Sequence, residues 1–239
     1  MKEINDKQNE KINENKENNL ENKSSELKEE SNNLKEKEIK LIYKCKFEGT
    51  KKIFGDSFVE NNKDNIELII NGEKNELINK YKLRKGENNI ILIIKNKIDN
   101  LSNMFYKCKS LKNIDGLKYL KTDDCKDFSR MFNWCSSLDD ITALEKWNVS
   151  KGTNFFGMFG GCSSLNNVKP LENWNVSNGI NFSYMFSECS LLSDVKPLEK
   201  WNVSNGNNFG CMFWECSSLS NIKALESWKL SKEQFKSLK

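Results

Sequence analysis

The chain has 239 residues, no histidine, and a net charge of +4 from 38 Lys and Arg against 34 Asp and Glu. The lack of histidine excludes Ser-His-Asp triads, Cys-His dyads and histidine zinc sites, and so small a net charge gives no argument for nucleic-acid binding. The first residues lack the apolar core of a signal peptide, and the longest aliphatic run, Ile90–Ile94, is far shorter than the roughly 20 residues of a membrane helix. We therefore expect no nucleic-acid partner and no membrane insertion. The expected location is the cytoplasm, or the cell surface if an export signal is missing from this sequence.

Residues 1–38 are rich in Asn, Lys and Glu and poor in apolar side chains. Such a segment buries too little apolar surface to offset its ordering entropy, so we expect a disordered or transiently helical charged tail. Leucines recur seven residues apart from Leu20 to Leu41. This is a weak coiled-coil signal, because the second apolar position of each heptad is polar. A short helix that docks on a partner is the alternative.

Residues 39–99 differ in composition from the charged tail and from the repeats. We expect them to form a small α+β module that caps the N-terminal end of the repeats. The stretch Ile39–Phe47 alternates between apolar and polar residues, as a half-buried strand does. Asn71-Gly72 is a strong hairpin signal after a second apolar run, and a short helix is predicted to start near Gly55. The aliphatic run Ile90–Ile94 is predicted to begin the stack of repeats. The predicted strands are 39–47, 66–70, a third that begins at 76–78, and 89–98.

A repeat with a step of 27 residues occupies most of the remaining chain, residues 100–239, in five copies without an insertion. One copy cannot bury enough apolar surface to fold alone, so the copies are expected to stack as a solenoid. A Met-Phe pair begins at Met104, Met131, Met158, Met185 and Met212. A cysteine column contains Cys108, Cys135, Cys162, Cys189 and Cys216. A tryptophan column contains Trp147, Trp174, Trp201 and Trp228, with Leu120 in the first copy.

Each copy contains two different spacings of apolar residues. From Phe155 to Cys162 the apolar residues are spaced i, i+3, i+4 and i+7, which predicts a short helix, and Asn154 before them is a strong N-cap residue. After the cysteine the apolar residues step by three, and a short strand is predicted near Leu165–Val168. The sequence thus predicts an α/β repeat with one short strand and one short helix per 27-residue turn. The cap residues of the other copies are Asn100, Asp127, Asn181 and Asn208.

The repeated pattern Met-Phe-x-x-Cys-Ser-Ser-Leu, followed by Trp-Asn-Val-Ser-Asn and the next Met-Phe, resembles the BspA-like leucine-rich repeats of bacterial surface proteins and protist proteins. The resemblance covers residues 100–231. It implies a parallel-stranded, curved solenoid that serves in adhesion or protein binding. A solenoid needs capped ends. The stretch Ser231–Gln234 fits a capping box that opens a final short helix with Phe235 and Leu238 on one side.

The cysteine column is the first candidate for a metal site or for disulfides. Metal sites favour Cys-x-x-Cys pairs, and the chain has none. We favour interior thiols that pack as small apolar side chains. Disulfides between neighbouring copies or a metal site are the alternative, since strand-like spacing would place these thiols about 5 Å apart. Outside the column, Cys45, Cys125 and Cys211 are the better candidates for reactive thiols.

Three further features have both a structural and a functional interpretation. The sequons at Asn148, Asn175 and Asn202 are interpreted as turn residues, with glycosylation as the alternative in an exported protein. The tryptophan column is interpreted as packing at the edge of the core rather than as a platform for carbohydrate or peptide. Asp139 and Asp140 are interpreted as a solvated pair rather than as an acid pair.

These patterns together predict a non-enzymatic scaffold that binds another protein and uses no cofactor, metal or small-molecule substrate. A cell-surface adhesin of the BspA type is the alternative, and a hydrolase is disfavoured because no acid, base and nucleophile converge. Positions between the fixed core residues differ from copy to copy, which is where a binding surface can be encoded. Their mixed charge favours a protein partner over a phosphate backbone. The candidate partner-binding residues are Asp139, Asp140, Thr142, Asn166, Asn167, Lys169, Ser193, Asp194, Lys196, Asn221 and Lys223.

Overall fold

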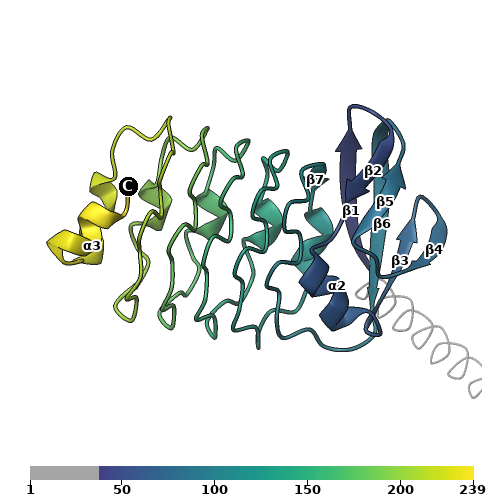
Figure 1. Cartoon of the computed structure of the whole chain (residues 1–239). Helices are drawn as coiled ribbons and strands as arrows, with labels where there is room; N and C mark the ends of the chain where they lie inside the picture. The colour runs from purple at the N-terminus through teal and green to yellow at the C-terminus, as the bar shows by residue number, and fades with distance from the viewer. Residues whose placement is uncertain (1–37) are drawn as a thin grey trace, which may run out of the picture. The chain divides into compact units, whose positions relative to one another are not determined.

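The computed structural model describes residues 38–239, of which Ile39–Lys239 form one compact unit. The predictions for the N-terminal tail, its disorder and its weak heptad pattern, lie outside the described residues. In Figure 1 the repeat copies are successive coils stacked side by side, with a β-rich module at one end of the stack and a helix at the other. We number the coils from one, which begins at Asn100, to five, which begins at Asn208.

The β-rich module contains two sheets and one helix. A five-stranded sheet has the order β4-β3-β6-β1-β7, and a smaller sheet pairs β2 with β5. The elements are β1 (Glu38–Cys45), β2 (Gly49–Lys52), α2 (Asp56–Asn62), β3 (Ile66–Ile70), β4 (Glu73–Glu76), β5 (Lys80–Leu83), β6 (Gly86–Ile94) and β7 (Leu111–Asn113). The sequence prediction missed β2 and β5, because these four-residue strands are mostly polar and show too little alternation.

The hairpin predicted at Asn71-Gly72 is confirmed. Both residues have positive φ, 50° and 96°, and Ile70 pairs with Glu73 across the turn. Two central residues with positive φ are typical of the tight turns whose twist matches that of a hairpin. The third strand, predicted to begin at 76–78, starts earlier: the two-residue turn places the start of the returning strand β4 at Glu73.

The strand that meets the repeats is β1. We predicted that Ile90–Ile94 begins the stack, and this prediction is wrong, because these residues belong to β6, which lies between β3 and β1. An open edge on so aliphatic a strand would invite pairing with other chains, and an interior position covers both of its edges. On the other side of β1, Ile42 and Tyr43 pair with Asn113 and Leu111 of the first coil.

The Met-Phe segment of each coil is a chain of turns, and the predicted helix is absent there. In coil three the amides of Phe155, Gly157, Phe159 and Gly161 donate to carbonyls of coil four over 2.7–2.9 Å. The amides between them, from Met158 onward, donate to carbonyls three residues back in their own coil over 3.0–3.2 Å. A helix would use its amides internally and would leave few hydrogen bonds to join one coil to the next.

Two inward residues alternate with two outward residues along this chain of turns. The resulting apolar spacing of i, i+3, i+4 and i+7 is the same as that of a helix face. The spacing therefore cannot distinguish a helix from this chain of turns. Every fourth residue has positive φ, as at Gly157 (57°) and Gly161 (74°). Recurring left-handed residues prevent a right-handed helix from propagating.

The predicted cap residues accept hydrogen bonds, although turns rather than helices follow them. Oδ1 of Asn100 accepts from the amide of Ser102 over 2.8 Å, and the four equivalent residues accept from the amide two positions further on. The same five residues form parallel bridges from each coil to the next. This ladder gives all five coils a common register.

The strand predicted near Leu165–Val168 is also absent, and only coil one has a strand at the equivalent place, β7, which pairs with β1. Each coil instead turns through a short 3₁₀ helix. Because a 3₁₀ helix has three residues per turn, apolar residues that step by three lie on one side of it. These helices are η1 (Asp115–Tyr119), η2 (Thr142–Leu144), η3 (Lys169–Leu171), η4 (Lys196–Leu198) and η5 (Lys223–Trp228).

Buried aromatic rings form columns through the stack. One column has ring centroids 5.5–5.7 Å apart between coils and contains Phe105, Phe132, Phe159, Phe186 and Phe213. The tryptophans are buried as well, and Nε1 of Trp174 donates to the carbonyl of Leu144 in the preceding coil over 2.9 Å. The other three tryptophans make the same hydrogen bond. Packing at the edge of the core is thus confirmed for the tryptophan column.

The helix α3 (Lys232–Ser237) closes the last coil (Figure 1). The predicted capping box is confirmed, with the Ser231 hydroxyl accepting from the Gln234 amide over 3.2 Å. In coil five the amides of Cys211 and Phe213 donate to the carbonyls of Ser237 and Leu238, both over 2.7 Å. The end of the chain therefore satisfies amides that a sixth coil would otherwise bond.

The capping box should have a measurable effect on stability. We expect Ser231→Ala to lower the free energy of unfolding by about 1 kcal/mol, because the Gln234 amide loses its acceptor. Ser231→Asp should be close to the wild type, since Asp is an equally good N-cap. Urea titration followed by tryptophan fluorescence measures both variants, and an equal loss in the two would contradict the assignment.

Candidate binding surface

The chain of turns presents a regular surface to solvent. We call it the outer turn face and define it as the outward positions within residues 102–107, 129–134, 156–161, 183–188 and 210–215, one segment from each coil. Each segment contributes two pairs of outward positions, which flank the buried Met-Phe pair. Because neighbouring coils are joined by backbone hydrogen bonds along this segment, the face is a stiff support for the side chains on it.

Aromatic side chains are concentrated on this face. Trp134, Tyr184 and Trp214 are exposed at 37%, 42% and 43%, and they are three of the seven exposed large apolar residues of the described chain. Tyr106 and Phe156 on the same face are half-buried. Each of the five coils therefore contributes one aromatic side chain. Aromatic residues are enriched in protein interfaces, where they dominate the binding energy.

The side chains on the face contact one another from coil to coil. The guanidinium of Arg130 lies 4.7 Å from the ring centroid of Phe156, and Phe156 meets Tyr184 edge to face at 5.8 Å. A hydrogen bond with the Cys211 side chain raises the pKa of Tyr184. Arg130, Phe156, Tyr184 and Cys211 thus form a continuous line over coils two to five.

The backbone under the face is strained at ordinary residues. Two residues per coil have positive φ, between 53° and 74°, and only two of the ten are glycine. A left-handed conformation costs a residue with a side chain about 1–2 kcal/mol. Glycine would avoid this cost, so residues such as Trp134 and Tyr184 are retained there against the local conformational preference. Strain of this kind is concentrated at functional sites.

Glycines in coil three make room for side chains of coil two. A Cβ on Gly161 would lie 2.8 Å from the Trp134 ring, and a Cβ on Gly160 would lie 2.6 Å from Nδ2 of Asn133. Gly157 accepts a hydrogen bond from that Asn133 amide through its carbonyl over 3.0 Å. The centre of the face is therefore low and carries few side chains of its own.

The charges on and beside the face are separated along the stack. Coils one and two carry Lys107, Lys109 and Arg130, whereas coils four and five carry Glu188 and Glu215. Among the residues that the structure describes, none of these five forms an ion pair, although other surface lysines do. The face therefore has a basic end, an uncharged centre and an acidic end.

The candidate residues from the sequence analysis lie elsewhere, at the starts of the 3₁₀ helices. Four of them have a structural role, because their side-chain oxygens accept from the amide two residues further on over 2.8–3.2 Å; these are Asp140, Asn167, Asp194 and Asn221. The hydroxyl and the amide of Thr142 lower the pKa of Asp140 in this way. Asp139 pairs with Lys112, and Lys169 pairs with Glu172. The exposed remainder contains Asn166, Ser193, Lys196 and Lys223, with no aromatic residue among them.

The eight cysteines are free thiols, so the structure contains no disulfide along the cysteine column. Each column thiol after the first donates to a phenylalanine carbonyl of the preceding coil over 3.0–3.2 Å. Burial raises the pKa of Cys162 to about 12, so this thiol stays protonated and unreactive. Of the off-column candidates, Cys45 and Cys125 are buried and Cys211 is partly exposed.

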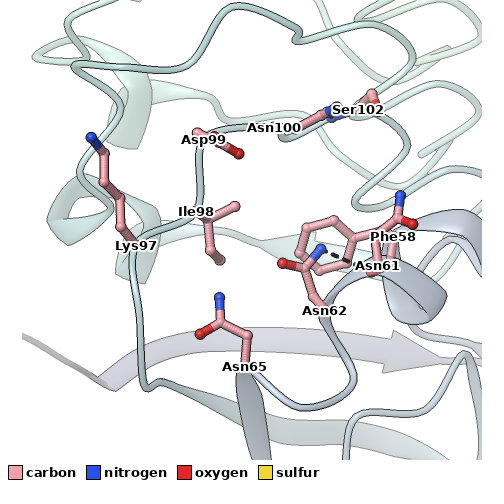
Figure 2. Close-up of a pocket in the computed structure, with 9 residues that line it drawn as sticks. All are labelled: Phe58, Asn61, Asn62, Asn65, Lys97, Ile98, Asp99, Asn100 and Ser102. Carbon is pink, nitrogen blue, oxygen red and sulfur yellow. Dashed lines mark hydrogen bonds between the residues drawn. The ribbon is translucent and has the colours of Figure 1, made fainter.

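A pocket lies between α2 and the segment that leads into coil one. It has a volume of about 230 Å³, and Figure 2 shows that Asn and Asp side chains from both segments line it. Several of these groups are already engaged: the Asn65 amide bonds the backbone of Asn96, and Lys97 pairs with Asp124. The lining offers no base beside a nucleophile. In the described residues, no group of three potential ligands is placed to hold a metal ion.

Two stretches of the chain, residues 77–170 and 143–237, match the family described as Mycoplasma protein of unknown function, DUF285. Together they cover more than half of the chain. The chain belongs to the DUF285 family. No curated protein and no solved structure matches it. The resemblance of the DUF285 repeats to BspA-like repeats stays a prediction. Over the described part of the chain, no helix combines the length and the apolar character needed to cross a bilayer.

Sequence reasoning missed the outer turn face of the DUF285 repeats. The predicted helix would have spread these positions around a cylinder, whereas the chain of turns places them on one surface. A signal was nevertheless present: Tyr106, Trp134, Phe156, Tyr184 and Trp214 are aromatic residues at positions that vary between copies. Aromatic residues at variable positions are poorly explained by packing between identical coils.

Proposed function

We propose that the protein is a non-enzymatic scaffold that binds another protein through the outer turn face. The observation that carries this proposal is that each coil places one aromatic residue on a stiff backbone, with three of the five exposed and two in strained left-handed conformations. Binding energy in protein interfaces comes mainly from such aromatic and arginine side chains. A stiff support lowers the ordering cost of binding.

The chemistry of the described residues supports a binding role over a catalytic one. The chain has no histidine, and the column thiols are buried and protonated. We therefore propose no cofactor, no small-molecule substrate and no nucleic-acid partner. A cytoplasmic location and a location at the cell surface are both compatible with this proposal.

The test is a cross-linking capture from the native cell with the full chain as bait. We expect the double variant Trp134→Gly/Tyr184→Gly to lose about 30-fold or more of the captured partner, since a truncated hot spot costs at least about 2 kcal/mol. The same variant should be as stable as the wild type, because glycine relieves the strain at both positions.

The matched control is Lys196→Ala/Lys223→Ala, which alters two exposed residues beside the 3₁₀ helices. Capture by this control should equal that of the wild type. Loss of the partner with the control and not with the glycine variant would overturn the proposal and favour the surface that the sequence analysis selected.

A further inference from the structure

We propose that the partner of the outer turn face is a second copy of the same chain, packed face to face with its stack antiparallel. This inference rests on the proposed function, because it names the partner of the same surface. Its basis is that the face is complementary to a second copy of itself when the order of the coils in that copy is reversed.

A twofold axis through coil three, parallel to the face and perpendicular to the stack, defines the arrangement. It places coil one against coil five of the second copy, coil two against coil four, and coil three against its own equivalent. The order of positions within each coil is preserved, so each outward position faces the same position of the opposite coil. Contacts of this kind occur in pairs and close the assembly as a dimer.

The charges agree with the antiparallel arrangement. Lys107 of coil one faces Glu215 of the second copy, because both are the last outward position of their coils. Arg130 of coil two faces Tyr184 of the opposite coil four, which allows a cation–π contact, and Glu188, four residues further along that coil, brings a carboxylate to the same pair of coils. A parallel arrangement would place the basic coils against basic coils and the acidic coils against acidic coils. Like charges in contact across an interface cost several kcal/mol.

The aromatic and glycine positions agree as well. Tyr106 of coil one faces Trp214 of coil five, and Phe156 of coil three faces its own equivalent. Gly157, Gly160 and Gly161 lie at the axis, where two copies must approach most closely. Because the centre of the face is low, Phe156 is the coil-three side chain that can fill the space between the two copies at the axis.

The size of the face fits a small dimer interface. Of the twenty outward positions per copy, fifteen keep exposed surface, because Gly157, Gly160, Gly161, Ser183 and Ser187 are buried. A standard protein interface uses about 20–30 residues on each side and buries about 800 Å² per partner. The spacing of the coils is even, with ring centroids 5.5–5.7 Å apart beneath the face, so the two faces keep their register over all five coils.

The test is a charge exchange, read out by sedimentation equilibrium of the full chain at low micromolar concentrations. The wild type is expected to be a dimer. We expect Lys107→Glu/Arg130→Glu, and separately Glu188→Lys/Glu215→Lys, to weaken the dimer by roughly 100-fold or more, because each places like charges opposite one another. An equimolar mixture of the two variants restores opposite charges at every contact and should form a heterodimer.

The control is Lys169→Glu/Lys196→Glu, which reverses two charges away from the outer turn face and should leave the dimer unchanged. A monomeric wild type at about 100 μM, or two reversed variants that remain dimers, would overturn the inference. If the dimer fails but Trp134→Gly/Tyr184→Gly still loses a captured partner, the proposed function stands with a different partner. If neither the dimer nor the captured partner responds, the proposed function fails as well.

Discussion

Phe159→Ala should lower the free energy of unfolding by about 3–5 kcal/mol, the range measured for buried phenylalanine. The Phe159 side chain has no exposed surface, and its ring lies between those of Phe132 and Phe186, with centroids 5.5 Å away on both sides. The backbone beneath is held to coil four by hydrogen bonds, so the coils cannot collapse into the space left by the ring. Urea denaturation followed by far-UV circular dichroism measures the loss.

The matched control is Phe156→Ala, which removes the same side chain from the same coil but from the outer turn face. Phe156 is half-buried and contacts only Arg130 and Tyr184 among aromatic and cationic groups. Its removal should cost no more than about 1.5 kcal/mol, the upper value for one aromatic contact. Equal losses in the two variants would show that Phe159 is not the centre of a continuous column, and the stacked arrangement would then be wrong.

The columns of the stack could be predicted from the sequence because the repeat has no insertion. With a fixed step, Phe132, Phe159 and Phe186 must occupy equivalent places, and burial of one implies burial of all. The conformation between these positions could not be predicted in the same way. An apolar pattern of two inward and two outward residues is common to a helix and to this chain of turns, and only the hydrogen bonds between coils distinguish the two.

Side-chain hydrogen bonds explain why the candidate surface of the sequence analysis differs from the outer turn face. We expected variable residues near Leu165–Val168 to lie on strands and to be free for a partner. Without strands there, Asn167 and Asp194 instead bond the amides that open the next 3₁₀ helix. The left-handed conformation of Trp134 and Tyr184 could not be predicted from the sequence, because glycine or asparagine is the residue expected in that conformation.

The N-terminal module shows which strand predictions from the sequence hold in the folded protein. Asn71-Gly72 predicted the hairpin correctly, since two residues of positive φ are needed there whatever surrounds the turn. The order of the strands depends on contacts distant in sequence, and the aliphatic run of β6 gave no indication that β1 would lie between it and coil one. The pairing of Tyr43 with Leu111 therefore emerges only from the structure.

Alkaline pH should unfold the protein through its buried thiols. Burial raises the pKa of Cys162 to about 12 and that of Cys216 to about 11, and it raises the pKa values of the other column thiols as well. The ordinary thiol value is 9.0. Above that pH the unfolded chain loses thiol protons that the folded chain keeps, so the folded state becomes less stable as the pH rises. Each thiol contributes about 1.4 kcal/mol per pH unit until its own folded pKa is reached.

Five column thiols therefore lower the free energy of unfolding by about 5 kcal/mol between pH 9 and pH 10, because each unfolded thiol is only half deprotonated at pH 9. This loss is comparable with the whole stability of a marginal domain. Cys162→Ser isolates one contribution, since a serine hydroxyl can still donate to the carbonyl of Phe132 but does not titrate in this range. Urea titrations at half-unit steps should give a constant difference between wild type and variant from pH 6 to pH 8, where both states keep the thiol proton. Above pH 9 the wild type should lose stability faster than the variant, by about 1 kcal/mol between pH 9 and pH 10 and by up to about 1.4 kcal/mol per pH unit above pH 10. Parallel slopes above pH 9 would mean that Cys162 is accessible to solvent, and the dry interior of the stack would have to be abandoned.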